Sequence, residues 1–252
     1  MRLSSIRNII PEKLYARLQL VDHYFNGERE LRLLGHLCDR KRVSLDIGAN
    51  IGTYIYFMRR YSHGVHAYEP NPELAARLKR LYSDVVIRQA AVSDTAGQVR
   101  LRIPVQGGRA SHELASVAQS YDWAEQVVDY IVPAVRIDDE DCGDVGFIKI
   151  DVEQHEIAVI NGALETIRRC KPVIMTEVTP LLYPRPLPEM FRFVIDMGYT
   201  GWFYFERKYH SFDVFSPQIH ADEAQWGQKF MGNNVIFLPQ GHSDEFLRKN
   251  SS

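Results

Sequence analysis

The sequence predicts an α/β protein built on a seven-stranded, mostly parallel sheet with helices on both faces. Two observations lead to this fold class. Short runs rich in Val and Ile alternate with segments whose apolar residues recur at helical spacing. A glycine-containing turn, residues 46–52, stands where the first of these runs gives way to a helical segment. Because strands that alternate with helices pair in parallel, both faces of such a sheet are covered.

The central elements follow one another in a regular order. Strands are expected at 43–47, 65–69, 85–92, 147–151 and 172–178, and helices at 51–61, 72–82 and 153–170. Pro72 suits the first turn of its helix, and Asn71 before it is a suitable N-cap. Each strand therefore ends close to the start of a helix or a polar turn.

Two regions depart from this alternation. Segments 98–104 and 127–137 have strand character without a crossover helix, so we expect a hairpin or sheet extension flanking the loop 106–113. After 178 we expect a helix at 189–197, strands at 200–205 and 234–238, and an irregular aromatic stretch between them. We expect one main domain, 41–239, a helical extension, 1–40, packed on it, and a loose polar tail, 240–252.

The composition is that of an ordinary soluble protein. Thirty basic and 32 acidic residues leave a net charge of −2, which gives no electrostatic footprint for nucleic acid. Cys38, Cys142 and Cys170 are few and widely spaced, which favours a reducing compartment. No signal peptide or membrane-spanning stretch is evident, so we expect a soluble, cytoplasmic protein.

The turn 46–52 has the properties of a nucleotide-type ligand site. Gly48 and Gly52 allow close approach of backbone to a ligand, and Asn50 tolerates the left-handed conformation. Glu69 ends the next strand, 21 residues after Gly48, where a carboxylate accepts hydrogen bonds from ribose hydroxyls.

The charge around this turn indicates which ligand binds. The glycine spacing of dinucleotide-dependent dehydrogenases is not met, because Asn50 and Thr53 stand at the second and third positions. The carboxyl edge of the predicted sheet is acidic, which repels a pyrophosphate and suits a ligand with an ammonium and a sulfonium. The acidic residues are Asp46, Glu69, Asp94, Asp151, Glu153 and Glu177. We therefore expect S-adenosyl-L-methionine as cofactor.

Several linked motifs resemble the FkbM-type methyltransferases. They are Asp-Ile-Gly-Ala-Asn-Ile-Gly at 46–52, Tyr-Glu-Pro-Asn-Pro at 68–72, Ala-Ala-Val-Ser-Asp at 90–94, Ile-Lys-Ile-Asp-Val-Glu at 148–153, Asn-Gly-Ala at 161–163, Lys-Pro at 171–172, Glu177, and Asn-Asn-Val-Ile-Phe-Leu-Pro at 233–239. The resemblance covers most of the chain. It implies the Rossmann-like class I methyltransferase architecture and O-methylation of a hydroxyl on a sugar, a glycan or a glycosylated small molecule.

One departure from the family pattern concerns the residue after Glu153. The family usually has Asp-Val-Glu-Gly-x-Glu, whereas Gln154 occupies the glycine position here. The added bulk bears on the shape of the acceptor pocket. It also leaves a non-catalytic cofactor-binding scaffold as an alternative, beside a less favoured nicotinamide-dependent oxidoreductase.

Methyl transfer to a hydroxyl needs a general base, and three residues are candidates for the catalytic site. Asp151 is our first choice, although it equally suits orienting the cofactor or capping the next helix. His155 is the rival base, with a surface or capping role as its alternative. Glu177 suits binding of the acceptor hydroxyl, or a bond to loop amides. Lys149, inside an apolar strand, needs a carboxylate partner, either Glu177 or Asp151.

The remaining assignments concern the cofactor and the acceptor. The cofactor-binding set also takes in Ser93 and Asp94, expected to read the adenine amino group, and we expect no metal site. The whole set is Asp46, Gly48, Asn50, Gly52, Thr53, Glu69, Pro70, Ser93, Asp94 and Asp151. For the acceptor, the stiff segment 181–188 suits a rim. Contacts from Trp202, Tyr204, Tyr209 and His112 compete with plain packing roles.

Overall fold

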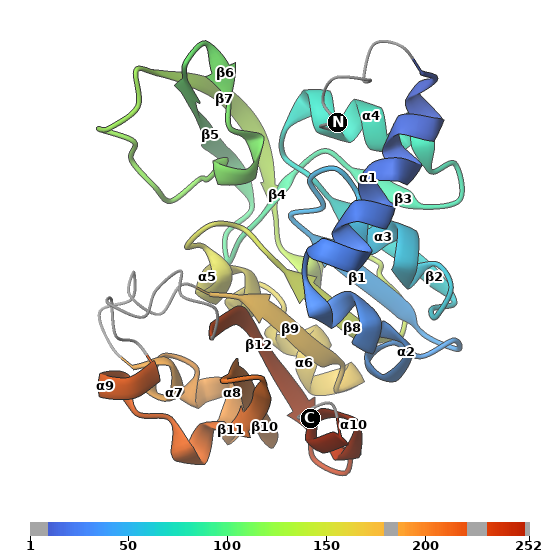
Figure 1. Ribbon diagram of the computed structural model, residues 1–252, viewed down its shortest axis with the longest axis vertical. Helices are drawn as coiled ribbons and strands as arrows, with labels where there is room; N and C mark the ends of the chain where they lie inside the picture. Colours follow the sequence, from blue (N-terminus) through green and yellow to red (C-terminus); the bar gives the residue numbers. More distant parts are fainter. Residues whose placement is uncertain (1–9, 179–185, 221–230, 250–252) are drawn as a thin grey trace.

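A central sheet with a parallel core organises the chain (Figure 1). The computed structural model describes residues 10–178, 186–220 and 231–249. Its main sheet has eight strands in the order β11-β10-β12-β9-β8-β1-β2-β3. The parallel core consists of β1 (Val43–Ile47), β2 (Gly64–Tyr68), β3 (Val86–Arg88), β8 (Val145–Ile150) and β9 (Val173–Glu177). The predicted fold class is confirmed.

The far end of the sheet is antiparallel and one strand larger than expected. The final pair, β10 (Tyr199–Phe205) and β12 (Met231–Pro239), is as expected, and β11 (Lys208–Ser211) is an additional strand within the aromatic stretch. Glu206 and Arg207, with φ of 47° and 68°, form the tight turn between β10 and β11. Hairpin turns of this kind usually carry Asn-Gly or Asp-Gly, so the sequence offered no signal for β11.

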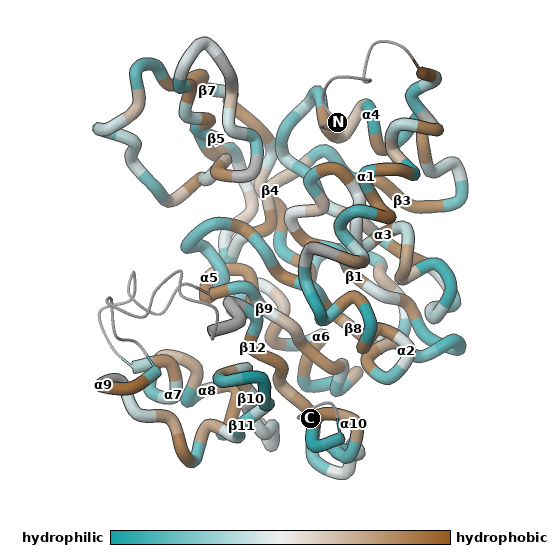
Figure 2. Tube along the Cα trace, in the orientation of Figure 1, coloured by the Kyte–Doolittle hydropathy of each residue, from teal (hydrophilic) through white to brown (hydrophobic). Residues whose placement is uncertain are grey.

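Alternating side chains of the central strands build two cores, one on each face of the sheet. Phe147, Val173 and Met175 pack with the apolar side chains of α2, α3 and α10, whereas Ile148 and Ile174 pack with those of α5, α6 and α8. Successive strand residues point to opposite faces, so one strand supplies both cores. Apolar colouring along β1, β8 and β9 reflects this double burial (Figure 2).

The helices begin and end where local chemistry dictates. Asn71 caps α4 by accepting hydrogen bonds from the backbone N–H groups of Glu73 (3.0 Å) and Leu74 (3.4 Å), as expected. The helix expected over 153–170 is two helices, and that over 189–197 is also two. The α-helices are α1 (Glu12–Asn26), α2 (Leu34–Leu37), α3 (Thr53–Met58), α4 (Pro72–Leu81), α5 (Glu156–Asn161), α6 (Leu164–Cys170), α7 (Leu187–Met190), α8 (Arg192–Asp196), α9 (Pro217–His220) and α10 (Glu245–Lys249). Single-turn 3₁₀ helices are η2 (Arg29–Leu33), η3 (His112–Leu114), η4 (Ile137–Asp139) and η6 (Phe212–Val214).

The break between α5 and α6 has a tertiary cause. A Cβ at Gly162 would lie 2.0 Å from the backbone oxygen of Ser93, so the chain passes against the end of another segment there. Helical periodicity alone does not show such a close approach. The apolar stripe predicted for one helix is therefore shared by two.

A second sheet forms a lobe beside the first (Figure 1). Its order is β4-β7-β5-β6, with β4 (Ala91–Val92), β5 (Gly97–Gln106), β6 (Arg109–Ala110) and β7 (Gln126–Val135). The expected hairpin is confirmed as the antiparallel pair β5–β7. The single strand expected over 85–92 is wrong, because β3 belongs to the main sheet and β4 to the second. The chain crosses from one sheet to the other between Arg88 and Ala91.

Both ends of the described chain pack on the main sheet. Ala16 and Leu20 of α1 are buried, and α1 contacts α3. The loose tail expected after 239 is wrong for α10, whose Phe246 and Leu247 are buried. His36 stacks on Phe246 with ring centroids 5.0 Å apart, so two apolar residues in a polar segment are enough to dock it. The domain boundaries at 40 and 239 stay predictions.

Candidate active site

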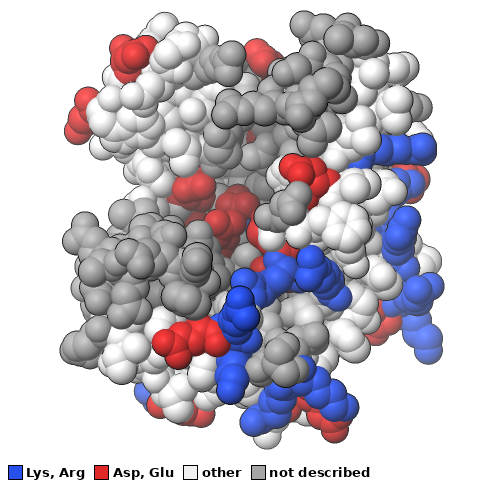
Figure 3. Space-filling view, in the orientation of Figure 1, with Lys and Arg blue, Asp and Glu red and all other residues white. Residues whose placement is uncertain are grey.

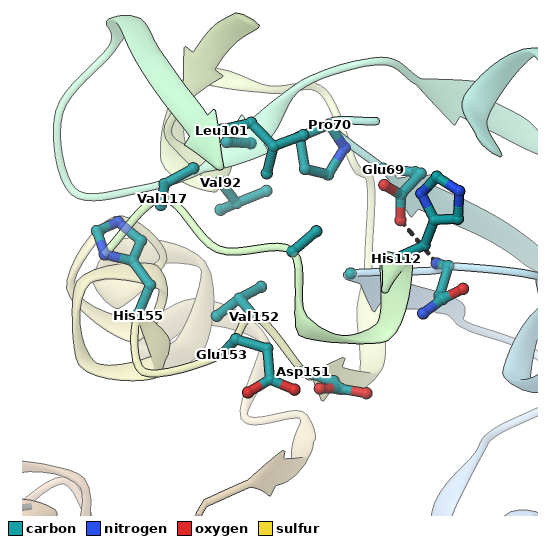
Figure 4. Close-up of a pocket in the computed structure, with 14 residues that line it drawn as sticks. Glu69, Pro70, Val92, Leu101, His112, Val117, Asp151, Val152, Glu153 and His155 are labelled. Atoms are coloured by element: carbon teal, nitrogen blue, oxygen red, sulfur yellow. Dashed lines mark hydrogen bonds between the residues drawn. The ribbon is translucent and has the colours of Figure 1, made fainter. Parts of the chain in front are cut away.

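Two adjoining cavities open at the carboxyl edge, the end of the main sheet where β1, β2, β8 and β9 finish. The first and smaller cavity is lined by Gly48, Asn50, Glu69, Pro70, Ala91, Val92, Leu101, His112, Ala115, Val117, Asp151, Val152, Glu153 and His155 (Figure 4). The second, of about 510 Å³, is lined by Gln19, His23, Glu28, Asp46, Gly48, Ala49, Asn50, Ile51, Thr53, Tyr54, Lys149, Asp151, Glu153 and Glu177. Gly48, Asn50, Asp151 and Glu153 belong to both linings, so they mark the junction.

The turn after β1 has the tight geometry that its sequence predicts. Gly48, Asn50 and Gly52 have left-handed φ angles of 82°, 48° and 86°. A Cβ at Gly48 would lie 1.8 Å from the backbone oxygen of Asp151, so any side chain there would push β1 and β8 apart. Gly52 packs against Leu78 and Tyr82 of α4 and its C-cap, and Thr53 begins α3.

Glu69 is held at the end of β2 by backbone donors. It is buried, and its Oε2 and Oε1 accept hydrogen bonds from the N–H groups of Asn50 (2.7 Å) and Asn71 (2.8 Å). Burial raises the pKa of Glu69 to about 7, although these two donors lower it. Each carboxylate oxygen retains a lone pair for a further donor. Figure 4 shows the carboxylate beside Pro70 and His112.

Ser93, Asp94 and His155 form a polar group behind the first cavity. Ser93 Oγ lies 2.9 Å from Nε2 of His155, and it donates to Asp94 Oδ1 at 3.3 Å. Only His155 of the three lines the cavity, where Ala91 and Val92 supply the apolar wall instead. Burial lowers the pKa of His155, while Asp94 raises it. Adenine contacts from Ser93 and Asp94 stay predictions.

The second sheet and the segment between its strands β6 and β7 form another wall of the first cavity. Leu101, His112 and Val117 line it, and His112 Nδ1 lies 2.9 Å from Nδ2 of Asn71. Ser116 Oγ donates to the backbone oxygen of Glu153 at 2.6 Å. Leu101, Ser116 and Val117 have no signal in the sequence, because no local pattern shows that a hairpin folds back over another sheet edge.

A buried lysine organises the end of β8. Lys149 Nζ lies 3.1 Å from Asp151 Oδ2 and 4.8 Å from the ring centroid of Tyr54. The predicted carboxylate partner is therefore confirmed as Asp151. Burial by itself lowers the pKa of Lys149, but the surrounding carboxylates, Asp151 foremost, outweigh it and leave the pKa above its ordinary value.

Two neighbouring carboxyl groups are costly to ionise. Burial, together with Asp151 and Glu28, raises the pKa of Asp46 to about 7, although Lys149 acts to lower it. Burial, with Asp151 and Glu156, also raises the pKa of Glu153 to about 7. Asp46 Oδ2 is buried, and no described residue forms a hydrogen bond with it. The sheet edge thus holds negative charge that the protein itself only partly neutralises.

The strained residues after Asp151 explain what is unusual about Gln154. Glu153 and Gln154 have φ angles of 50° and 72°, a conformation that favours glycine at either position. The N–H of Gln154 donates to Glu156 Oε1 at 3.0 Å, which helps to hold the turn. Gln154 is absent from the linings of the two cavities described above. Its departure from the family pattern therefore acts on the backbone rather than on the cavity shape.

The second cavity has a wall that the sequence did not reveal. Glu177 lies at the end of β9, as expected, but Gln19 and His23 of α1 and Glu28 after it face the same space. Glu28 Oε2 accepts hydrogen bonds from Tyr54 Oη (2.6 Å) and Asn234 Nδ2 (2.9 Å). In the space-filling view, acidic side chains gather in the hollow of this face (Figure 3). Only tertiary packing brings Glu28 there.

Several other expectations for the acceptor region have mixed outcomes. Trp202, Tyr204 and Tyr209 are buried in the core beside α10 and η2, and none lines either cavity, which favours their packing role. The rim expected at 181–188 lies outside the described residues up to position 185.

Within the described ranges, no three His, Cys, Asp or Glu side chains converge as a metal site would require. No helix in those ranges is long and apolar enough to cross a bilayer.

Comparison with known proteins places the chain in a family. Residues 46–200 match the model of the methyltransferase FkbM domain. No curated protein matches the sequence significantly. The match takes in the turn after β1, Glu69, the second sheet, Asp151 and Glu177, and it ends within β10.

Several solved structures are similar to the chain at low identity, with TM-scores below 0.5. Methyltransferase FkbM from Methylobacillus flagellatus KT is 16% identical, with a TM-score of 0.49, over 93% of this chain and 57% of that one. This chain thus spans little more than half of that protein. A TehB-like SAM-dependent methyltransferase from Corynebacterium glutamicum is 14% identical over 90% and 97%, with a TM-score of 0.42. An rRNA methylase from Streptococcus thermophilus is 10% identical over 84% and 94%, with a TM-score of 0.42. The family match decides the assignment: the chain belongs to the FkbM methyltransferase family, and its cofactor is S-adenosyl-L-methionine.

Proposed function

We propose that this protein transfers the methyl group of S-adenosylmethionine to a hydroxyl of a sugar, a glycan or a glycosylated small molecule. The junction of the two cavities carries the proposal. Asp151 lines both, so a carboxylate stands between the space for the donor and the space for an acceptor. That is the position that a base needs when a hydroxyl oxygen attacks a methyl carbon in line.

The residues of the first cavity and of the adjoining turn after β1 fit the cofactor. The remaining lone pairs of Glu69 suit ribose hydroxyls, and the absence of a side chain at Gly48 allows the backbone to approach closely. Asp46 lines the second cavity, and its buried Oδ2 has no hydrogen-bond partner among the described residues, so it suits a donor such as the cofactor's ammonium. We assign Asn50 and Pro70 in the first cavity and Thr53 in the second to cofactor binding, with Gly52 shaping the turn and with Ser93 and Asp94 towards the adenine. When bound, S-adenosylmethionine supplies an electrophilic methyl carbon on its sulfonium.

Asp151 is the residue that we assign as general base. Its side chain is 31% exposed, and the ion pair with Lys149 fixes the carboxylate at the junction. Asp151 would take the proton from the acceptor hydroxyl as the oxygen–carbon bond forms. We assign Glu177, at the neighbouring strand end, to hold that hydroxyl. His155 lines the first cavity but not the second, and it is hydrogen-bonded to Ser93. We therefore rank it behind Asp151 as the general base.

A hydroxyl acceptor suits the second cavity better than a nucleic acid does. Gln19 and His23 offer polar groups to sugar hydroxyls, and the surrounding carboxylates would repel phosphodiesters. The cavity is also large enough, at about 510 Å³, for a group of monosaccharide size. The acceptor is therefore proposed as a sugar-containing small molecule or glycan.

One experiment tests the proposal directly. The protein is incubated with methyl-labelled S-adenosylmethionine and a set of glycans and glycosides, and products are examined by mass spectrometry for a labelled O-methyl group. Asp151→Asn should lower turnover by about 10²-fold or more while S-adenosylhomocysteine still binds. Asp129→Asn, at an exposed ion pair on β7, serves as control. Cofactor binding without turnover on any hydroxyl would favour a non-catalytic scaffold, and full turnover by the Asp151 variant would remove it as base.

A further inference from the structure

The second cavity has a surplus of negative charge that a neutral sugar would leave uncompensated. Five carboxylates line it, against one lysine among the described lining residues: Glu28, Asp46, Asp151, Glu153 and Glu177 face Lys149. Lys149 is already committed to Asp151 at 3.1 Å. Burial first, and the neighbouring carboxylates second, raise the pKa values of Asp46 and Glu153 to about 7, so ionising these groups is costly unless a ligand brings positive charge.

The cofactor accounts for only part of this surplus. Its ammonium and sulfonium are balanced in part by its own carboxylate, so it carries a single net positive charge into the cavity region. Asp46 Oδ2 is buried and has no hydrogen-bond partner among the described residues, so this oxygen can accept from a donor on a ligand. If the cofactor ammonium satisfies Asp46, Glu28 and Glu177 still face the space that remains.

Among these carboxylates, Glu28 gives the clearest indication of which ligand group binds in the remaining space. It lies outside the family match of 46–200, in the segment between α1 and η2. Tyr54 and Asn234 both donate to Oε2, and within the described part of the chain no hydrogen bond reaches Oε1. Two donors thus orient the carboxylate while leaving an oxygen available at the cavity.

The residues that follow Glu28 are held in place by contacts with β10 and β11. The next residues are anchored: Arg29 stacks over the Tyr204 ring at 3.5 Å, and buried Glu30 accepts a hydrogen bond from Tyr209 at 2.9 Å. A carboxylate that two donors orient, and that anchored residues follow, loses little side-chain entropy when it binds a ligand. Such preorganisation suits a charge-assisted hydrogen bond.

We propose that the acceptor carries a protonated amine, as an amino sugar does, and that Glu28 contacts this ammonium while a neighbouring hydroxyl is methylated. This inference rests on the proposed function, because it names the acceptor class of the same cavity. Acceptors with a carboxylate or phosphate near the hydroxyl should bind poorly, because they would add negative charge to the lining.

Matched trisaccharides test the amine directly. Binding to the full chain saturated with S-adenosylhomocysteine is measured calorimetrically for a glucosamine trisaccharide, its fully N-acetylated counterpart and a galacturonic acid trisaccharide. We expect the free amine to bind at least about tenfold more tightly than the N-acetyl form, and the uronic acid to bind most weakly. Equal binding, or a preference for the N-acetyl or acidic sugar, overturns the inference.

A charge-removing variant tests the role of Glu28. Glu28→Gln retains an oxygen that accepts from Tyr54 and Asn234, so the fold should be preserved, and thermal unfolding checks this. The amine preference should fall about tenfold. Glu165→Gln, which removes the same charge from an exposed position of α6, should leave the preference unchanged. A preference that survives in Glu28→Gln overturns the assignment of the ammonium to Glu28, and the wild-type comparison stands even if this variant fails to fold.

Turnover separates this inference from the proposed function. If the amine-bearing sugar binds but gains no methyl group, recognition of the ammonium by Glu28 stands, and both methylation of a neighbouring hydroxyl and the proposed O-methylation of this class fall. If neutral hydroxyl acceptors are methylated with no preference for an amine, the proposed function stands and the inference falls.

Discussion

The two sides of the active site are built in different ways. The carboxyl edge of the main sheet consists of short motifs in which backbone geometry and buried carboxylates do the positioning, as at Gly48 and Glu69. The covering segments, α1 with Glu28 on one side and the second sheet on the other, reach the cavities through single side chains such as His112. The comparison indicates that the proposed donor side depends on backbone positions where an added side chain would clash. The covering side depends on single side-chain contacts, each of which contributes a small free energy.

The largest effect should come from Gly48→Ala on the carboxyl edge. A Cβ there would lie 1.8 Å from the backbone oxygen of Asp151, at a φ of 82° that also disfavours alanine. We expect a loss of at least about 2 kcal/mol in the free energy of unfolding and loss of measurable S-adenosylhomocysteine binding. Urea unfolding and calorimetry measure both.

The control is Gly64→Ala, at the start of β2, where no atom lies within 4 Å of the added Cβ. This variant should change stability by less than about 1 kcal/mol. Near-normal cofactor binding by Gly48→Ala would contradict the close backbone approach at the turn.

The second-largest effect should be a pH dependence of stability that comes from the carboxyl edge and not from the covering segments. Burial raises the folded-state pKa of Asp46 to about 7 from an ordinary value of 3.8. The unfolded state therefore loses this proton first, and the stability contributed by the protonated form is lost as pH rises from about 4 to about 7. Burial acts in the same direction on Glu69. The free protein should unfold more easily at pH 8 than at pH 5.

Asp46→Asn mimics the protonated carboxyl. It should raise the free energy of unfolding at pH 8 by on the order of 1–3 kcal/mol, flatten the pH dependence and weaken S-adenosylhomocysteine binding. Chemical unfolding between pH 5 and 8 gives the comparison. Asp129→Asn, exposed on β7, should leave the slope as it is, and an unchanged slope in Asp46→Asn would remove Asp46 as its source.

Gln154→Gly tests whether the family departure is a matter of backbone strain. Glycine adopts the φ of 72° without a side-chain penalty, so we expect a gain of about 0.5–1 kcal/mol in the free energy of unfolding. Calorimetric unfolding should show a rise in Tm with cofactor affinity unchanged. A large change in acceptor affinity would instead place Gln154 at the acceptor.

The smallest effect should come from a substitution in a covering segment. His112→Ala removes the contact between η3 and Asn71, so we expect cofactor affinity to fall by about three- to tenfold with little change in Tm. His63→Ala, exposed between α3 and β2, is the matched control. If His112→Ala abolished binding altogether, the covering side would be as intolerant as the edge, and the comparison would fail.

The success of sequence reasoning differed between these regions for a physical reason. The turn 46–52, the cap at Asn71 and the β5–β7 hairpin involve residues close in sequence or strongly periodic, and all three are confirmed. The misses arise from distant contacts. Ser93 against Gly162 divides a predicted helix, and the step from β3 to β4 divides a predicted strand between two sheets.

The sequence by itself determined the parallel sheet, the glycine turn and the row of carboxylates at strand ends, because each depends on periodicity or on local backbone conformation. Only the tertiary structure decided that Lys149 pairs with Asp151, that the second sheet covers the first cavity and that Glu28 enters the second. Those contacts join segments whose meeting depends on packing across the whole sheet. The proposed donor side could thus be predicted from motifs, whereas the proposed acceptor side required the fold.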